Sequence, residues 1–431
     1  MRRFSNLARL AALVLLAAVA ACTERIESGA ACPELCPTEN VPVRDTTLDA
    51  VVFDSVLSGY PGPGEQALFL LAAQPRPDSL DVRAVVRFDS LPARYFPAGA
   101  ADSVQITQVD SGFITLHLDT TGTLLTQAAT ISAYDVDTVG VANDTSAAVI
   151  NRLFRPDRLI GAVTIQPGGL TADSLRVPIS NAAIAAKARD TLKLRIGLRI
   201  SSAAPVRLRA ISSQGGATTN PVRLSFDPKS ATDTTYSPIV LTPTSSTPTG
   251  DAERALGLRD FTVVAAGTVP SFGTDLVVGG LPARRTFLRF SVPSRFVDSA
   301  TIVRATLLLN QRPVPGVPAS DTVELTTDVV VADQSVTDLR RSIDLSAAGA
   351  GFGVDSLRIS PADSGLRSLG LVNLVRSWRS FPATTQRAVV LRTRLEGAQV
   401  SALRFISAEG SSTLRPRVRI SYIPRTEFAL P

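Results

Sequence analysis

Regular alternation of apolar and polar residues is the feature that most limits how this chain can fold. It is clearest at residues 192–200, where Leu or Ile at every second position is separated by Lys193, Arg195, Gly197 and Arg199. Alternation with period two places one set of side chains on each face of a β-strand. The same pattern recurs at 303–309 and 417–422. We therefore predict an all-β protein of antiparallel sheets, each with a buried face and a solvent-facing one that carries the arginines.

Length and composition predict how these strands are divided. The 431 residues exceed what one hydrophobic core usually supports, and 45% apolar with 19% charged residues is typical of a folded chain. Two polar segments rich in Pro, Ser and Thr interrupt the alternation and read as linkers. We predict a signal peptide, a tether, a first β-sandwich, a linker and a second β-sandwich, at 1–21, 22–46, 47–230, 231–252 and 253–431.

Short segments of the first half recur in the second. Residues 206–212 and 221–228 resemble 401–407 and 416–424, and 85–88 resemble 287–290. The segment 173–176 also recurs, at 355–358, and each copy precedes a short stretch with helical spacing. This repetition predicts two copies of one antiparallel, jelly-roll-like sandwich, each with about eight to ten strands.

The N-terminus has the order of features that an export signal needs. Arg2 and Arg3 precede an apolar stretch at 10–21, which ends at Cys22. A membrane-spanning helix and an ordinary, unlipidated leader are the two competing interpretations. The apolar stretch is shorter than the ~20 residues that a membrane-spanning helix needs. Val19-Ala20-Ala21-Cys22 resembles the lipobox of bacterial lipoproteins. That resemblance implies acylation of Cys22 and anchoring to the cell envelope, and Thr23 in the next position implies the outer membrane.

Net charge bears on nucleic-acid binding, and the two cysteines after Cys22 bear on disulfide formation. The formal charge is +6, but Arg2, Arg3 and Arg9 lie in the leader, which leaves +3, too little to indicate nucleic-acid binding. Cys32 and Cys36 are close enough for a small-loop disulfide in an oxidising compartment, and two free thiols are the alternative.

Metal binding has only one candidate in the sequence. Asp135, Asp137 and Asp144, with Asn143 beside them, form the densest cluster of oxygen ligands. Such a cluster suits a structural calcium ion, and a plain turn rich in Asp and Asn is the competing interpretation. His117 is the only histidine of the chain, so a zinc site of the usual His and Cys ligands is not indicated.

Residues 270–424 resemble the DNRLRE, or disaggregatase-related repeat, family. The resemblance is carried by 286–290, 300–309, 372–378, 389–391 and 405–418. It implies a jelly-roll module, classed with carbohydrate-binding modules, that attaches its protein to polysaccharide without catalysis. The first half departs from this pattern, because nothing there replaces Trp378 and Gln214 stands where the second half has Glu409.

Sugar recognition usually needs an exposed aromatic ring and polar groups beside it. Trp378 lies next to apolar positions of a helical segment, which favours a core role over a binding role for this side chain. Tyr60 and Tyr95 stand near Pro and Gly residues of predicted turns, where a ring can reach solvent. Trp378, Tyr60 and Tyr95 are therefore the candidate ligand-binding residues.

A catalytic set is not evident in the sequence. The chain has no Gly-x-Ser-x-Gly motif, and alternation places His117 on the polar face of its strand with Thr115 and Asp119. Acidic residues are scattered without a spacing that selects a pair. We predict a non-catalytic binding or adhesion protein, with a structural envelope protein that meets a partner or an anionic glycan as the alternative. An exported hydrolase is the third hypothesis, and it requires a deep acidic cleft.

Overall fold

The computed structural model describes residues 43–62, 64–75, 79–89, 91–137, 147–170, 173–215, 221–230, 235–244, 259–267, 272–330, 355–380 and 387–424. Apart from Val43, all of these residues lie in one compact unit, Arg44–Pro431. The predicted signal peptide, Cys22, Cys32 and Cys36 lie outside the described residues. No helix within the described ranges has the length and hydropathy needed to cross a membrane.

The fold-class prediction of antiparallel β-sandwiches is confirmed. Eleven strands make up what we call the N-terminal sandwich, in the sheet order β14-β13-β7-β12-β3-β4-β11-β8-β9, with β10 beside β7 and β15 beside β4. Their bounds are β3 (Leu68–Gln74), β4 (Leu80–Phe88), β7 (Gln108–Leu125), β8 (Ala129–Asp135), β9 (Leu159–Ile165), β10 (Ser174–Pro178), β11 (Leu194–Ser202), β12 (Val206–Ile211), β13 (Arg223–Lys229), β14 (Ile239–Leu241) and β15 (Asp260–Ala266). The hairpin β5 (Arg94–Tyr95) and β6 (Val104–Gln105) and the helices α2 (Ala147–Arg152) and α3 (Asn181–Arg189) complete it.

A second set of eleven strands makes up the C-terminal sandwich, in the order β1-β24-β18-β23-β16-β17-β22-β19-β20, with β21 beside β18 and β2 beside β17. Its strands are β1 (Arg44–Leu48), β2 (Val51–Tyr60), β16 (Leu276–Gly279), β17 (Ala283–Phe290), β18 (Ala300–Arg312), β19 (Val323–Val330), β20 (Ser356–Ile359), β21 (Gly365–Gly370), β22 (Arg387–Thr393), β23 (Ala402–Phe405) and β24 (Arg417–Pro424). The short helices α4 (Ser294–Val297) and α6 (Val372–Ser377) lie against β18.

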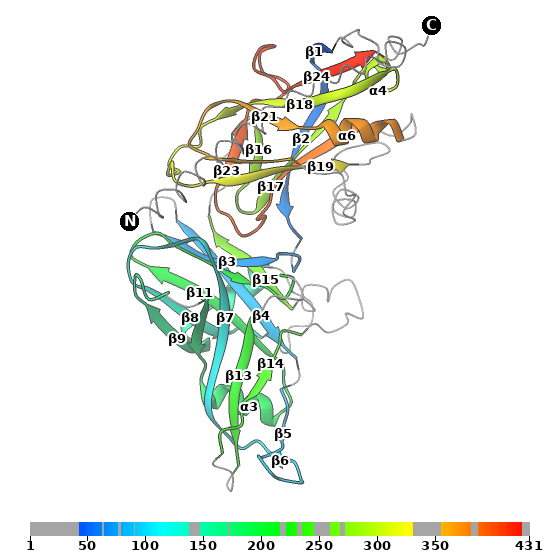
Figure 1. Cartoon of the computed structure of the whole chain (residues 1–431). Helices are drawn as coiled ribbons and strands as arrows, with labels where there is room; N and C mark the ends of the chain where they lie inside the picture. The colour runs from blue at the N-terminus through cyan, green and yellow to red at the C-terminus, as the bar shows by residue number, and fades with distance from the viewer. Residues whose placement is uncertain are drawn as a thin grey trace, which may run out of the picture. The chain divides into compact units, whose positions relative to one another are not determined.

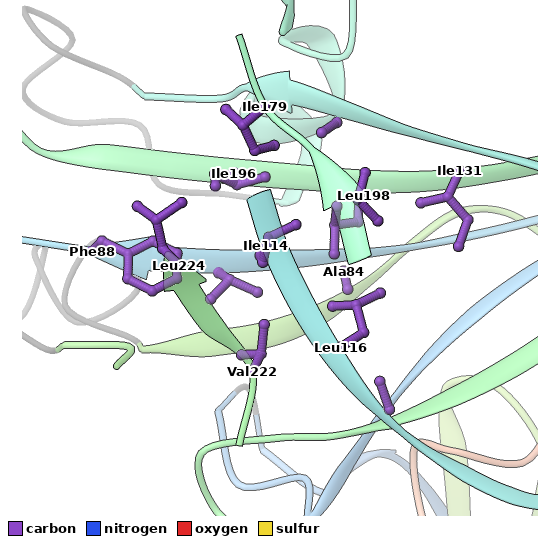
Figure 2. Packing of buried hydrophobic residues seen from close by; sticks show 14 of the residues in the cluster. Ala84, Phe88, Ile114, Leu116, Ile131, Ile179, Ile196, Leu198, Val222 and Leu224 are labelled. Atoms are coloured by element: carbon purple, nitrogen blue, oxygen red, sulfur yellow. The ribbon is translucent and has the colours of Figure 1, made fainter. Parts of the chain in front are cut away.

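Strand β7 joins the two layers of the N-terminal sandwich. Its first part pairs with β13 and β10, and its last part pairs with β12 after a shift of register near Arg209. Figure 2 shows Ile114 and Leu116 of β7 beside Ile196 and Leu198 of β11, within one apolar cluster. All four side chains are buried. The alternation of the sequence therefore builds the core, because every second side chain of each layer points inward.

The outer face of β4 and β11 differs from the prediction. We expected Arg195 to face water, yet its side chain is 3% exposed, and Arg87 opposite it on β4 is 2% exposed. The cause is a second apolar layer around α2 that covers this face, formed by Val85, Val136, Ile150, Phe261 and Val263. Gly197 allows the close approach, because a Cβ there would lie 2.6 Å from the ring of Phe154.

The repeat in the sequence corresponds to a repeat in topology. The two sheet orders match strand for strand, so β7 corresponds to β18, β12 to β23 and β13 to β24. One predicted correspondence differs from the structure. Residues 173–176 lie at the start of β10, which is equivalent to β21, whereas 355–358 fall at β20 and pair with β19.

The predicted division at 231–252 does not separate the two sandwiches. β1 and β2 pair with β24 and β17 of the C-terminal sandwich, although the sequence predicts residues 47–60 in the first domain. Figure 1 shows both strands, drawn in blue, among the yellow to red strands of that sandwich. Conversely, β14 pairs with β13 and β15 with β4, so part of the predicted linker and the start of the predicted second domain belong to the N-terminal sandwich. The physical reason is that edge pairing links strands far apart in sequence, and composition breaks do not record it.

We predict that deleting residues 43–60 destabilises the C-terminal sandwich by about 3 kcal/mol or more, because the deletion removes Tyr60 and Ala50 from buried positions and uncovers β17 and β24. Thermal unfolding followed by circular dichroism measures the effect. Deletion of the preceding residues 23–42 is the matched control. Equal unfolding midpoints for the two deletion variants would show that β1 and β2 contribute nothing to stability.

Candidate functional site

The three aromatic side chains predicted to bind ligand are buried. Trp378 is 2% exposed and packs on Phe290 in the core of the C-terminal sandwich, with ring centroids 5.5 Å apart. Tyr95 is 5% exposed within the N-terminal core. Tyr60 is 3% exposed, because the pairing of β2 with β17 places it opposite Ala283. The prediction that Tyr60 and Tyr95 reach solvent is wrong, and none of the three rings is available for stacking on a sugar. The preferred core interpretation of Trp378 agrees with its burial.

The predicted calcium ligands already have a cationic partner. The Lys187 Nζ lies 3.2 Å from a carboxylate oxygen of Asp135 and 3.0 Å from one of Asp137. Arg158 also donates hydrogen bonds to the main-chain oxygens of both aspartates, at 2.9 Å each. Asp144 lies outside the described residues, and within the described ranges no group of three His, Cys, Asp or Glu residues is placed to hold a metal ion.

His117 lies on β7 opposite Ser174 of β10 and is half-buried. Burial lowers the pKa of the imidazole below its usual value, and the positive charge of Arg223 lowers it further. Residues 115, 117 and 119 share one face of β7, as the alternation predicted, but that face is only partly open to solvent.

A pocket of about 520 Å³ lies beside β17 and β22, and we call it the arginine pocket. Three guanidinium groups line it together with two carboxylates and mainly small or aliphatic residues. The lining residues are Pro61, Gly64, Glu65, Ala67, Leu68, Gln214, Arg285, Arg392, Arg394, Leu395, Glu396 and Ala398. They come from the segment after β2 and the first residue of β3, from the turn after β12, from β17 and from the end of β22 with the turn that follows it.

A buried ion pair forms the inner wall of this pocket. Arg285 donates from Nε and Nη2 to the two carboxylate oxygens of Glu396, at 2.7 and 2.6 Å, and both side chains are less than a tenth exposed. The ring of Tyr60 lies 4.0 Å from the guanidinium carbon of Arg285, a cation–π geometry. The Nη1 of Arg285 is buried without a hydrogen-bond acceptor among the described residues.

The two other arginines of the pocket are paired on their outer side. Arg392 donates from Nε to Asp328 of β19, and Arg394 donates from Nη1 to Glu324 at 3.3 Å. Neither acidic partner lines the pocket. The lining therefore carries three positive and two negative groups, and each of its arginines already has one carboxylate partner, Glu396 for Arg285, Asp328 for Arg392 and Glu324 for Arg394.

This arrangement suits an anionic group. Guanidinium donors form short, charge-assisted hydrogen bonds to carboxylate oxygens, often two at a time. Ser, Cys and His, the usual nucleophiles and bases, do not occur among the described lining residues. The sequence did not reveal this site, because Arg285 and Glu396 are 111 positions apart and neither lies in a recognisable motif. The one compositional signal in this direction is that nearly all basic residues of the chain are arginines, with Lys187, Lys193 and Lys229 as its lysines.

Comparisons with known proteins do not identify the chain. No family model matches it, and neither does any curated protein. Among solved structures, it is similar to the structure of the Macrobrachium rosenbergii nodavirus, with 7% identity over 90% of this chain and 93% of that one. The TM-score of that match is 0.15, which is too low to indicate a shared fold.

Removing the Tyr60 hydroxyl should change the alkaline stability of the protein. Burial raises the pKa of Tyr60 to about 12, from an ordinary value of 10.0, although the charge of Arg285 opposes the shift. Because the folded-state pKa is the higher one, the stabilisation is complete below pH 10 and is lost as the pH rises from about 10 towards 12. We predict that Tyr60→Phe leaves the unfolding free energy at pH 7 nearly unchanged and flattens its decline in that window. Denaturant titrations at pH 7 and pH 11 measure this, and an unchanged decline would assign it to other groups.

Breaking the buried ion pair should be costly. We expect Glu396→Gln to lower the unfolding free energy by about 3 to 5 kcal/mol, because Arg285 then remains buried without its carboxylate. The matched control is Glu324→Gln, whose partner Arg394 has a side chain 69% exposed, with an expected loss below about 1 kcal/mol. Chemical denaturation of both variants provides the comparison, and equal losses would contradict the special role of the buried pair.

Proposed function

We propose that this protein is a lipid-anchored, exported binding protein without catalytic activity, and that its arginine pocket binds an acidic saccharide of a polysaccharide. The observation that carries the proposal is the arginine pocket. Three guanidinium groups line it, one of them buried with an unused N–H donor, and they exceed the carboxylates of the same lining.

The N-terminal sequence supports the export and anchoring part of the proposal. The order Arg2 and Arg3, apolar segment and Cys22 is that of a lipoprotein leader. Acyl chains on Cys22 would hold the protein at a bilayer, since each buried methylene contributes about 0.8 kcal/mol. The resemblance of residues 270–424 to the disaggregatase-related repeat family adds the expectation of attachment to polysaccharide.

The types of side chain that line the arginine pocket favour an acidic sugar over a neutral one as its ligand. Neutral sugars are usually held by exposed aromatic rings, and the described residues that line the pocket include no aromatic side chain. A uronate carboxylate, in contrast, matches the donors of Arg392 and Arg394, and the aliphatic walls at Leu68 and Leu395 suit the apolar face of a sugar ring.

Binding can be tested with the full chain, purified in detergent, on an array of neutral and uronate-containing polysaccharides. We expect binding to the acidic set, weakened about tenfold or more by Ala67→Trp, which fills the pocket from an exposed position. Ala101→Trp, at an exposed alanine outside the pocket lining, should bind like the unchanged chain. Binding that Ala67→Trp does not weaken would remove the pocket from the proposal, and no binding to any glycan would favour a protein partner in the envelope.

Anchoring requires a separate test. We expect metabolic labelling with a fatty-acid analogue to mark the unchanged chain and to be lost in Cys22→Ala, because the thiol is the acylation site of a lipoprotein. Cys32→Ala is the matched control, with labelling retained. Labelling that persists in Cys22→Ala would contradict the lipoprotein assignment.

A further inference from the structure

Each sandwich is completed by a pair of strands that belongs to the other half of the repeat. In sequence order, β1 and β2 precede the strands β3 to β13, and β14 and β15 precede β16 to β24. We call β1 with β2, and β14 with β15, the leading pairs. β1 occupies the place beside β24 that β14 occupies beside β13, and β2 occupies the place beside β17 that β15 occupies beside β4. Each leading pair therefore lies on the body that it does not precede.

The first leading pair is bound to the C-terminal sandwich over its whole length. β1 pairs with β24 from Arg44 opposite Tyr422 to Leu48 opposite Val418, and β2 pairs with β17 from Val51 to Tyr60. Between the two strands, the main-chain oxygen of Ala50 accepts a hydrogen bond of 2.8 Å from the N–H of Ser291.

Side chains add specificity to this docking. The main-chain N–H of Ala408 donates to the Asp54 carboxylate at 2.7 Å, and Asp45 accepts hydrogen bonds from Ser421 and Arg419. Arg415 also pairs with Asp49. The acceptor edge thus recognises this particular segment through both strand pairing and charge.

The two leading pairs make equivalent strand pairings, but they differ in their position in the sequence relative to the sandwich that each one completes. β14 follows β13 directly in the chain, so the N-terminal sandwich is completed by the segment after its own body. The C-terminal sandwich is completed by a segment that precedes both bodies. Residues 61–67 alone separate β2 in one sandwich from β3 in the other.

We propose that the edge formed by β17 and β24 also accepts the segment Arg44–Tyr60 of a second copy of this chain, which links copies by strand exchange. Such an exchange can preserve the strand pairing of Arg44–Tyr60, while the connection at 61–67 takes another path, and its extent depends on protein concentration. The exchanged segment ends at Tyr60, beside Arg285 of the arginine pocket, but the inference does not rest on the proposed ligand.

Mixed single-cysteine chains test this exchange. In one full-length chain Asp45 is replaced by Cys, in another Ser421 is replaced by Cys, and Cys22, Cys32 and Cys36 are Ser in both. The two side chains face each other across β1 and β24, so pairing of β1 of one copy with β24 of the other favours a disulfide between the two chains over the background of random collisions. We expect a disulfide-linked dimer on a non-reducing gel after the mixture is unfolded and refolded at rising protein concentration.

Two controls make the result decisive. A chain with both Asp45→Cys and Ser421→Cys should link internally, which shows that the geometry permits the bond. Replacing the second partner with a Ser174→Cys chain, at an exposed position of β10, should give no dimer above background. An internal link in the double variant without any dimer in the Asp45→Cys and Ser421→Cys mixture would overturn the proposal.

Discussion

The pairing of β2 with β17 is the constraint on which most of the structure depends. It brings the last residue of β2, Tyr60, under the guanidinium of Arg285, and it places Pro61 at the wall of the arginine pocket. On the other face of the same sheet it helps to close the C-terminal core around Val56 and Leu288. Fold closure and pocket geometry therefore share one strand, and a change in its register would disturb both.

The charged inner wall of the arginine pocket is an ion pair whose burial is unfavourable in free energy. Burial of Arg285 and Glu396 removes two charges from water, and bidentate hydrogen bonding offsets that cost only while both partners are present. The ring of Tyr60 cannot accept a conventional hydrogen bond from Nη1, so this donor stays unused, and the Tyr60 hydroxyl is also buried without a hydrogen-bond partner among the described residues. An unused buried donor is unfavourable for folding alone, and a ligand oxygen would satisfy it.

The sequence predicted the elements better than their partners. Period-two alternation at 192–200 and 417–422 correctly indicated β11 and β24, and the repeated segments indicated one topology used twice. Alternation cannot reveal which edge a strand joins, because the energy of pairing comes from residues hundreds of positions away, as with Asp54 and Ala408. For the same reason neighbouring Gly and Pro suggested that Tyr60 was exposed, although a distant strand covers it.

Within one chain, the placement of each leading pair on the other sandwich also explains why two repeats form one compact unit. Neither body is complete with its own preceding strands, so folding of each sandwich requires strands from beyond the composition break near residue 240. The long separation between β1 and β24 means that the first strands of the chain must wait for the last ones before they can pair. During that interval β1 lacks its partner, which is the condition under which the β24 edge of a neighbouring copy can compete for it.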